Sequence, residues 1–156
     1  MPHDTVIAAH IDSFSELPGG LLPLLHAIQK DLGYIPPSSI DAIARGMNLS
    51  RAEVHGVISF YVDFHTKPLG RHVLQICRAE ACQAAGVREL EAHAKQSLGL
   101  DYGETSTDGQ LTLLPVYCLG NCACSPSVRI DDDVHARVDP SRLDDLLAQL
   151  PTGEGR

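Results

Sequence analysis

Five cysteines fall in two groups, and their placement limits the possible folds more than any other feature of the chain. Cys77 and Cys82 are separated by four residues, whereas Cys118, Cys122 and Cys124 share one short segment. Both groups follow segments with the pattern of buried strands, so they can meet only if those strands are neighbours in one sheet. In a cytoplasmic chain, clustered cysteines in an odd number indicate metal or redox chemistry rather than disulfides.

The first part of the chain has the apolar spacing of helices. Residues 21–32 repeat apolar side chains at helical intervals, and Gly33 supplies a stop. Residues 5–14 fit a further helix. Ser38 and Ser39 stand where side chains cap a helix, so we expect a short third helix after them.

A capping box marks the start of a fourth helix, because the side chains of Ser50 and Glu53 can each satisfy a free backbone donor. The apolar stripe of this helix runs to Tyr61, and residues 67–70 then break the helical pattern. We therefore predict a small helical bundle over residues 1–68.

The pattern changes in residues 69–156, where short strands alternate with helices. A strand, a helix, paired strands and a closing helix amount to a small α/β unit of thioredoxin-like size, so the predicted fold class is α+β. The expected elements are a strand at 72–76, a helix at 84–98, a hairpin around Asp108 and Gly109, a strand at 111–116, strands at 128–130 and 134–138, and a helix from Pro140.

Charge and composition argue against several functions. With 20 acidic against 12 basic side chains, the net charge of −8 repels nucleic acid. Tryptophan is absent, and the sequence has no G-x-G-x-x-G loop for a dinucleotide, so we expect this chain alone to catalyse nothing. No apolar run approaches the roughly 18 residues of a membrane span, and the first residues lack a signal-peptide pattern. We expect a cytoplasmic protein with no direct membrane insertion.

Cys77, Cys82, Cys118 and Cys122 supply the four thiolates that a [2Fe-2S] cluster needs. Gly120 allows the loop between the last two to fold tightly and to aim backbone N–H groups at sulfur. Zinc is the competing metal, although zinc sites more often use cysteines two to four apart, commonly with histidine. A zinc-stabilised assembly module is therefore the second hypothesis, from a different functional class.

Two other assignments of the cysteines fit less well. A Rieske centre needs histidines close to its cysteines, and neither cysteine segment contains one. A thiol oxidoreductase favours Cys-x-x-Cys at a helix start, whereas a single residue separates Cys122 from Cys124 and would strain a disulfide. We expect Cys124 to be a small buried apolar side chain rather than a fifth ligand.

Residues 22–36, which include Leu-Gly-Tyr-Ile-Pro, and residues 49–57, with Glu-Val-His-Gly-Val, are specific motifs. With the cysteine motifs Cys-x4-Cys and Cys-Leu-Gly-x-Cys, they make the chain resemble the 24 kDa subunit family of NADH:quinone oxidoreductase. The resemblance extends from about Leu17 to Leu150. The cysteines that it implies as cluster ligands are Cys77, Cys82, Cys118 and Cys122.

The resemblance implies a helical bundle followed by a thioredoxin-like [2Fe-2S] ferredoxin domain with a mixed sheet. It also implies a non-catalytic electron-transfer subunit. Its partners would be an FMN/[4Fe-4S] diaphorase subunit that binds NAD and a larger iron–sulfur catalytic subunit. The compact length and residues 122–126, where the commoner run ends in Ala-Pro, make the chain most similar to the gamma subunit of NAD-dependent formate dehydrogenase. The matching subunits of respiratory complex I and of NAD-reducing hydrogenases are the alternatives.

Overall fold

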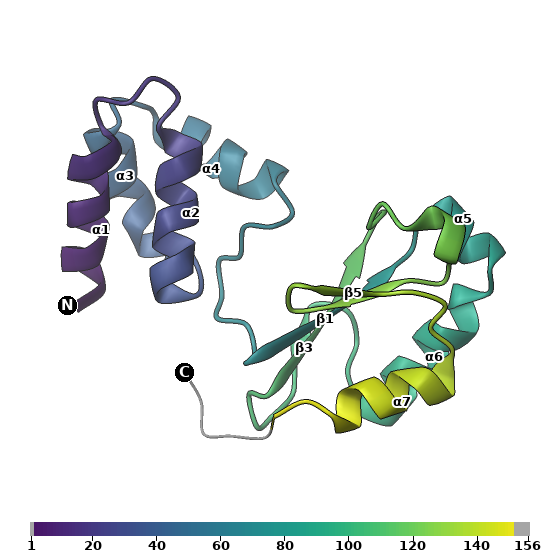
Figure 1. Cartoon of the computed structure of the whole chain (residues 1–156). Helices are drawn as coiled ribbons and strands as arrows, with labels where there is room; N and C mark the ends of the chain where they lie inside the picture. Colours follow the sequence, from purple (N-terminus) through teal and green to yellow (C-terminus); the bar gives the residue numbers. More distant parts are fainter. Residues whose placement is uncertain (1, 152–156) are drawn as a thin grey trace. The chain divides into compact units, whose positions relative to one another are not determined.

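The structure is a computed structural model that describes residues 2–151. The chain divides between Pro68 and Leu69 into two compact units, one helical and one built around a sheet (Figure 1). This confirms the predicted α+β class. The last five residues of the predicted second domain, 152–156, lie outside the described residues.

The helices of the first unit close their apolar faces on one core. Leu24, Ile28, Ile43 and Val54 are among the side chains with no solvent exposure there. Burial of such side chains, rather than helix propensity, holds short helices together. The helices are α1 (Pro2–Phe14), α2 (Leu21–Leu32), α3 (Ile40–Gly46) and α4 (Arg51–Phe60).

The helix ends test the predicted caps. Gly33 ends α2 in the left-handed region at φ 80°, where its N–H donates to Gln29, as glycine after a helix commonly does. The capping box between Ser50 and Glu53 is present in full at the start of α4. The predicted serine cap of α3 is wrong: the Ser39 hydroxyl donates to the Pro36 carbonyl at 2.6 Å, because a one-turn 3-10 helix precedes α3.

A five-stranded mixed sheet forms the second unit, with strand order β2-β3-β1-β4-β5. β1 and β3 are parallel, and the remaining pairs are antiparallel. Helices α6 and α7 pack against each other, and they share one apolar core with the sheet (Figure 1). The elements are β1 (His72–Cys77), α5 (Glu80–Ala84), α6 (Val87–Leu98), β2 (Glu104–Thr105), β3 (Leu111–Val116), β4 (Val128–Ile130), β5 (Asp133–His135) and α7 (Pro140–Ala148).

Two predicted elements of this unit differ from the structure. The helix expected at 84–98 begins only at Val87, as α6, and the short helix α5 before it was not predicted. Gly86, with φ 91°, turns the chain between the two helices. The strand expected at 134–138 ends at His135. Its continuation leaves the sheet because the N–H groups of Arg137 and Val138 donate to the carbonyls of Cys124 and Pro126 instead.

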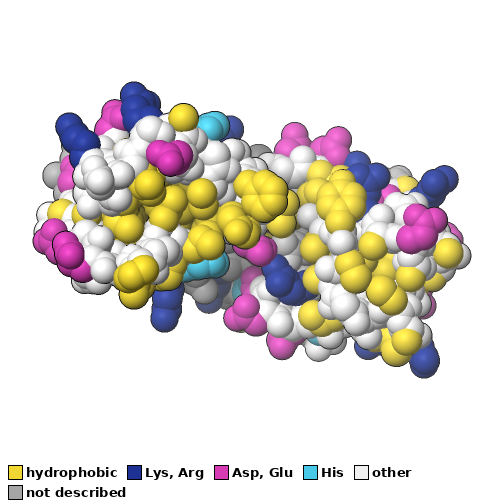
Figure 2. Space-filling view, turned by 90° about the horizontal axis from the view of Figure 1, so that it is seen from above, with side chains coloured by type: hydrophobic (Ala, Val, Ile, Leu, Met, Phe, Trp, Pro, Cys, Tyr) yellow, Lys and Arg dark blue, Asp and Glu magenta, His cyan; other side chains and the backbone are white. Residues whose placement is uncertain are grey.

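Within the described residues, no helix has the length and apolar character needed to cross a membrane. Large apolar side chains nevertheless reach the surface, most fully Phe60 and Val62 at the end of the helical unit. Figure 2 shows apolar side chains gathered on the surface of each unit.

Candidate metal centre

The parallel pairing of β1 with β3 brings the two cysteine segments to the same edge of the sheet. Cys77 is the last residue of β1, and its partner in the ladder is Val116. Cys118 follows Val116 by two residues, so both loops leave the sheet side by side. The strand predicted at 72–76 is present as β1, and its pairing with β3 meets the condition under which the two cysteine segments come together.

Cys77 and Cys82 form the buried half of the site, each with 2% of its surface exposed. Cys77 ends the strand, and Cys82 projects from the short helix α5 that follows. Burial is the main cause that raises the pKa of the Cys77 thiol, and its hydrogen bond with the Cys82 thiol raises that pKa further. The two sulfurs therefore form one interacting pair.

Cys118 and Cys122 form the exposed half of the site. Their sulfurs lie 3.6 Å apart. Gly120 has φ 75°, and its N–H donates to the Cys118 sulfur at 3.3 Å, as predicted for this loop. That hydrogen bond is the main reason that the pKa of Cys118 is lowered, because it stabilises the thiolate. Cys118 itself has φ 108°, a strained region for a residue with a side chain.

The two pairs lie close enough to influence one another. The pKa of Cys122 is raised first by its hydrogen bond with Cys118 and then by the charges of Cys118, Cys77 and Cys82. The structure therefore brings all four predicted cysteines into one neighbourhood, with two sulfurs buried and two facing solvent.

This donor set suits a two-iron cluster. The four sulfurs lie in two pairs, Cys77 with Cys82 and Cys118 with Cys122. Four cysteine thiolates are the ordinary ligands of a [2Fe-2S] cluster, so the residues present fit this group.

Cys124 differs from its prediction as a buried side chain, because it is partly exposed. It ends the one-turn 3-10 helix Cys122–Cys124, which keeps the loop on the surface. The Cys124 carbonyl accepts from the Arg137 N–H at 2.8 Å, so the backbone of this residue ties the loop to the chain after β5. Cys124 therefore holds the loop in place through its backbone carbonyl.

Two serines after the last cysteine were not singled out by the sequence analysis. The Ser125 hydroxyl lies 3.4 Å from the Cys82 sulfur and donates to the Cys122 carbonyl at 2.9 Å. Ser127 is buried, and its hydroxyl contacts the carbonyls of Asn121 and Cys124. A serine in a turn has no sequence signature that distinguishes a contact with sulfur from one with solvent.

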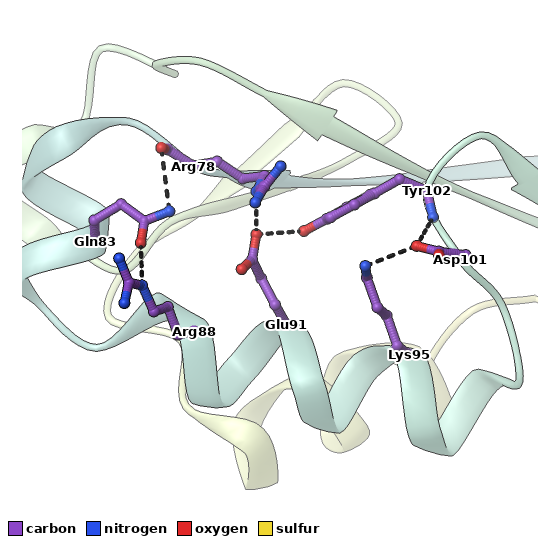
Figure 3. Close-up of polar contacts among 7 residues, drawn as sticks. All are labelled: Arg78, Gln83, Arg88, Glu91, Lys95, Asp101 and Tyr102. Atoms are coloured by element: carbon purple, nitrogen blue, oxygen red, sulfur yellow. Dashed lines mark hydrogen bonds and ion pairs between the residues drawn. The ribbon is translucent and has the colours of Figure 1, made fainter.

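A polar network fixes the segment between Cys77 and Cys82 to helix α6 (Figure 3). Arg78 pairs with Glu91 of α6, and the Tyr102 hydroxyl donates to the same carboxylate at 2.7 Å. Gln83 donates to the Arg78 carbonyl and accepts from Arg88. Burial and the Glu91 hydrogen bond raise the pKa of Tyr102, which therefore stays protonated as a donor. The network holds the backbone that carries the buried cysteine pair.

The mixed sheet and its four gathered thiols define a small α/β protein of the metal-binding, redox class. The chain belongs to the thioredoxin-like [2Fe-2S] ferredoxin family, whose model matches residues 7–151. The predicted family is thereby confirmed, and the cofactor is a [2Fe-2S] cluster. Ferredoxins carry electrons, so the family is one of electron-transfer proteins.

Relatives with curated descriptions are similar over most of the chain. A subunit of the NADH-quinone oxidoreductase of Pseudomonas aeruginosa and its counterpart in Escherichia coli K12 are each 37% identical over 123 residues, which cover 79% of this chain and 74% of the relative. NADH-quinone oxidoreductase subunit 2 of Thermus thermophilus is 36% identical over 135 residues, covering 86% of this chain and 75% of the relative.

A solved structure is also similar. The crystal structure of an NAD+-reducing [NiFe]-hydrogenase in the H2-reduced state superposes with a TM-score of 0.69 at 25% identity. The match covers 85% of this chain but only 23% of the hydrogenase chain, so this chain corresponds to about a quarter of that protein.

Proposed function

We propose that this chain is the electron-transfer subunit of a multisubunit, NAD-linked oxidoreductase. Cys77, Cys82, Cys118 and Cys122 hold its [2Fe-2S] cluster, which supplies storage for one electron when bound. Cys118 and Cys122, the exposed pair, mark the side from which electrons enter and leave. The partner that exchanges them is an FMN-containing diaphorase subunit.

One observation carries this proposal: two buried and two exposed thiols meet at one sheet edge, and the exposed pair is 3.6 Å apart. A structural metal site is usually enclosed by its ligands, whereas electron exchange between proteins needs a cofactor close to the surface. The buried pair anchors the site, and the exposed pair leaves it accessible to a redox partner.

The surrounding residues support an electron carrier by what they do to sulfur charge. The Gly120 N–H points at the Cys118 sulfur at a distance of 3.3 Å. A donor in this position favours the more negative, reduced state. The backbone therefore helps the site accept an electron without any change in side-chain ionisation.

Within this class, we propose the gamma subunit of an NAD-dependent formate dehydrogenase, with a larger iron–sulfur catalytic subunit as the second partner. Support comes from residues 122–126, Cys-Ala-Cys-Ser-Pro. The relatives described above are subunits of NADH-quinone oxidoreductase and part of an NAD+-reducing hydrogenase, which makes these two complexes the alternatives.

The test of the cluster uses the full chain purified without oxygen. Iron and acid-labile sulfide are counted, and the dithionite-reduced sample is examined by electron paramagnetic resonance (EPR). The expected result is two irons and two sulfides per chain with a rhombic spin-half signal. A sample that holds stoichiometric zinc after iron and sulfide have been offered in excess would contradict the carrier function and favour an assembly module.

The test of the parent complex uses an affinity tag on this chain in its native cells. The subunits that co-purify are identified by mass spectrometry, and the assembly is assayed for NAD reduction by formate, NAD reduction by hydrogen, and quinone reduction by NADH. Formate-dependent NAD reduction is the expected activity. Activity with only hydrogen or only quinone would instead assign the chain to one of the alternative complexes.

A further inference from the structure

The Ser125 hydroxyl lies between two residues of the cluster site. Its oxygen is 3.4 Å from the Cys82 sulfur and 2.9 Å from the Cys122 carbonyl oxygen. Cys82 belongs to the buried pair and Cys122 to the exposed pair, so this one hydroxyl touches both halves of the site. Ser125 itself is half-buried.

The direction of the hydrogen bond to Cys82 depends on whether that sulfur carries a proton. With a thiol at Cys82, the sulfur donates to the Ser125 oxygen, and the hydroxyl proton goes to the Cys122 carbonyl. A cysteine that binds iron does so as a thiolate, which has no proton to donate. The contact between the two atoms can then be a hydrogen bond only if Ser125 is the donor.

The hydroxyl has one proton and two acceptors within reach. The Cys122 carbonyl is a neutral acceptor at the shorter distance, whereas the Cys82 thiolate becomes a stronger acceptor as negative charge builds up on the ligand sulfurs. Rotation of the hydroxyl about the Cβ–Oγ bond moves the proton between them while the oxygen stays in place. The negative charge on the Cys82 sulfur therefore determines whether the Ser125 hydroxyl donates to that sulfur or to the Cys122 carbonyl.

We propose that Ser125 sets the reduction potential of the cluster by donating a hydrogen bond to the Cys82 sulfur in the reduced state. This inference rests on the proposed function, because it requires Cys82 to be a ligand. The reduction itself adds one electron, delivered by the flavin partner or by dithionite in a test. No proton leaves Ser125. The hydroxyl only turns from the Cys122 carbonyl towards the sulfur.

Substitution of Ser125 tests the proposal on the full, cluster-loaded chain. Ser125→Ala removes the donor, so the reduced state loses one charge-assisted hydrogen bond, and the equilibrium shifts towards the oxidised cluster by about tenfold. For a one-electron couple this shift is about 59 mV towards lower potential. The midpoint is measured by redox titration followed by EPR, and Ser125→Thr, which keeps the hydroxyl, retains the wild-type midpoint.

Ser106→Ala is the matched control. The Ser106 hydroxyl also makes loop hydrogen bonds, to Asp108 and to the Leu111 N–H, but it precedes β3, whereas Cys77 and Cys118 lie at the opposite end of the parallel pair β1 and β3. The midpoint of this variant stays at the wild-type value, which separates a contact with sulfur from a general effect of removing a serine hydroxyl.

A second measurement detects the hydrogen bond itself. In wild-type chain exchanged into heavy water, pulsed EPR detects deuterium coupled to the reduced cluster, and the Ser125 hydroxyl contributes one such coupling beyond those of the backbone amides. Loss of this coupling together with a lowered midpoint in Ser125→Ala supports the proposal. If Ser125→Ala keeps both the deuterium coupling and the midpoint of the wild type, the role of Ser125 is wrong and the proposed function still stands. If the wild-type chain itself gives no cluster signal, the proposed function is wrong as well.

Discussion

Cys77 lies opposite Val116 in the parallel ladder between β1 and β3, and Cys118 follows Val116 by two residues. This pairing brings the buried and the exposed cysteines to the same edge of the sheet. The pairing of these two strands therefore creates the four-cysteine site.

Removal of a single ligand provides the first prediction. Changing Cys77, Cys82, Cys118 or Cys122 to Ala leaves three thiolates, so we expect cluster content to fall at least tenfold in each variant. Cys124→Ala is the control, since the role of that residue is carried by its backbone carbonyl, and it should retain wild-type iron and sulfide. Full iron content in Cys118→Ala would show that Cys124 can act as a ligand.

A second prediction concerns the turn between the exposed cysteines. Gly120→Ala forces a side chain into a backbone with φ 75°, which costs about 1–2 kcal/mol although the added methyl group meets no atom. We expect faster loss of visible cluster absorption in urea. Gly56→Ala within α4 also meets no atom, yet it should stabilise the helical unit slightly, because alanine favours a helix. Equal effects of both changes would rule out the conformational explanation.

The network in Figure 3 supports a third prediction. Tyr102→Phe removes the hydroxyl that donates to the buried Glu91 carboxylate, so the sheet unit should lose about 1 kcal/mol of unfolding free energy. Denaturant unfolding of the apo chain measures the loss. The hydroxyl of Tyr117 belongs to a side chain that is 68% exposed, and Tyr117→Phe should leave stability unchanged. A larger loss for Tyr117→Phe than for Tyr102→Phe would contradict this account.

The capping box gives a prediction about pH. Hydrogen bonds from the Ser50 backbone and then its hydroxyl lower the pKa of Glu53 from its usual 4.5. A carboxyl group whose pKa is lower in the folded than in the unfolded state stabilises the fold above the unfolded pKa. That contribution disappears as the pH falls through the folded-state pKa.

Hydrogen exchange of the α4 amides measures this effect. Between pH 6 and pH 3, after correction for the intrinsic exchange rate, protection should fall more in the wild type than in Glu53→Gln, whose amide keeps the cap but does not titrate. Glu16→Gln lies outside the helices and serves as the control. The same loss of protection in wild type and Glu53→Gln would contradict the role of the carboxylate.

Local sequence patterns predicted the elements that depend on local physics. The helix predicted at 21–32 has the same bounds as α2, because both its apolar spacing and its end at Gly33 depend on residues close together in the sequence. The Ser50 and Glu53 box was equally local. The position of each cysteine group at a strand end was local as well, whereas the pairing of the two strands, which brings the groups together, is shown by the structure.

Features set by nonlocal hydrogen bonds escaped prediction. The strand after Asp133 ends early because carbonyls of the cysteine loop compete for its N–H groups. Ser125 likewise gains its sulfur contact from Cys82, which lies 43 positions earlier in the chain. Such partners are chosen by the folded structure rather than by neighbouring residues.

The parallel pairing of β1 with β3 also determines when the chain can receive its cofactor. Parallel strands need a long crossover, here containing α5 and α6, and closing it is a slow, entropically costly step. Until it closes, the chain offers two separate thiol pairs rather than one site with four thiols. The acceptor for iron and sulfide is therefore complete only once β1 and β3 have paired.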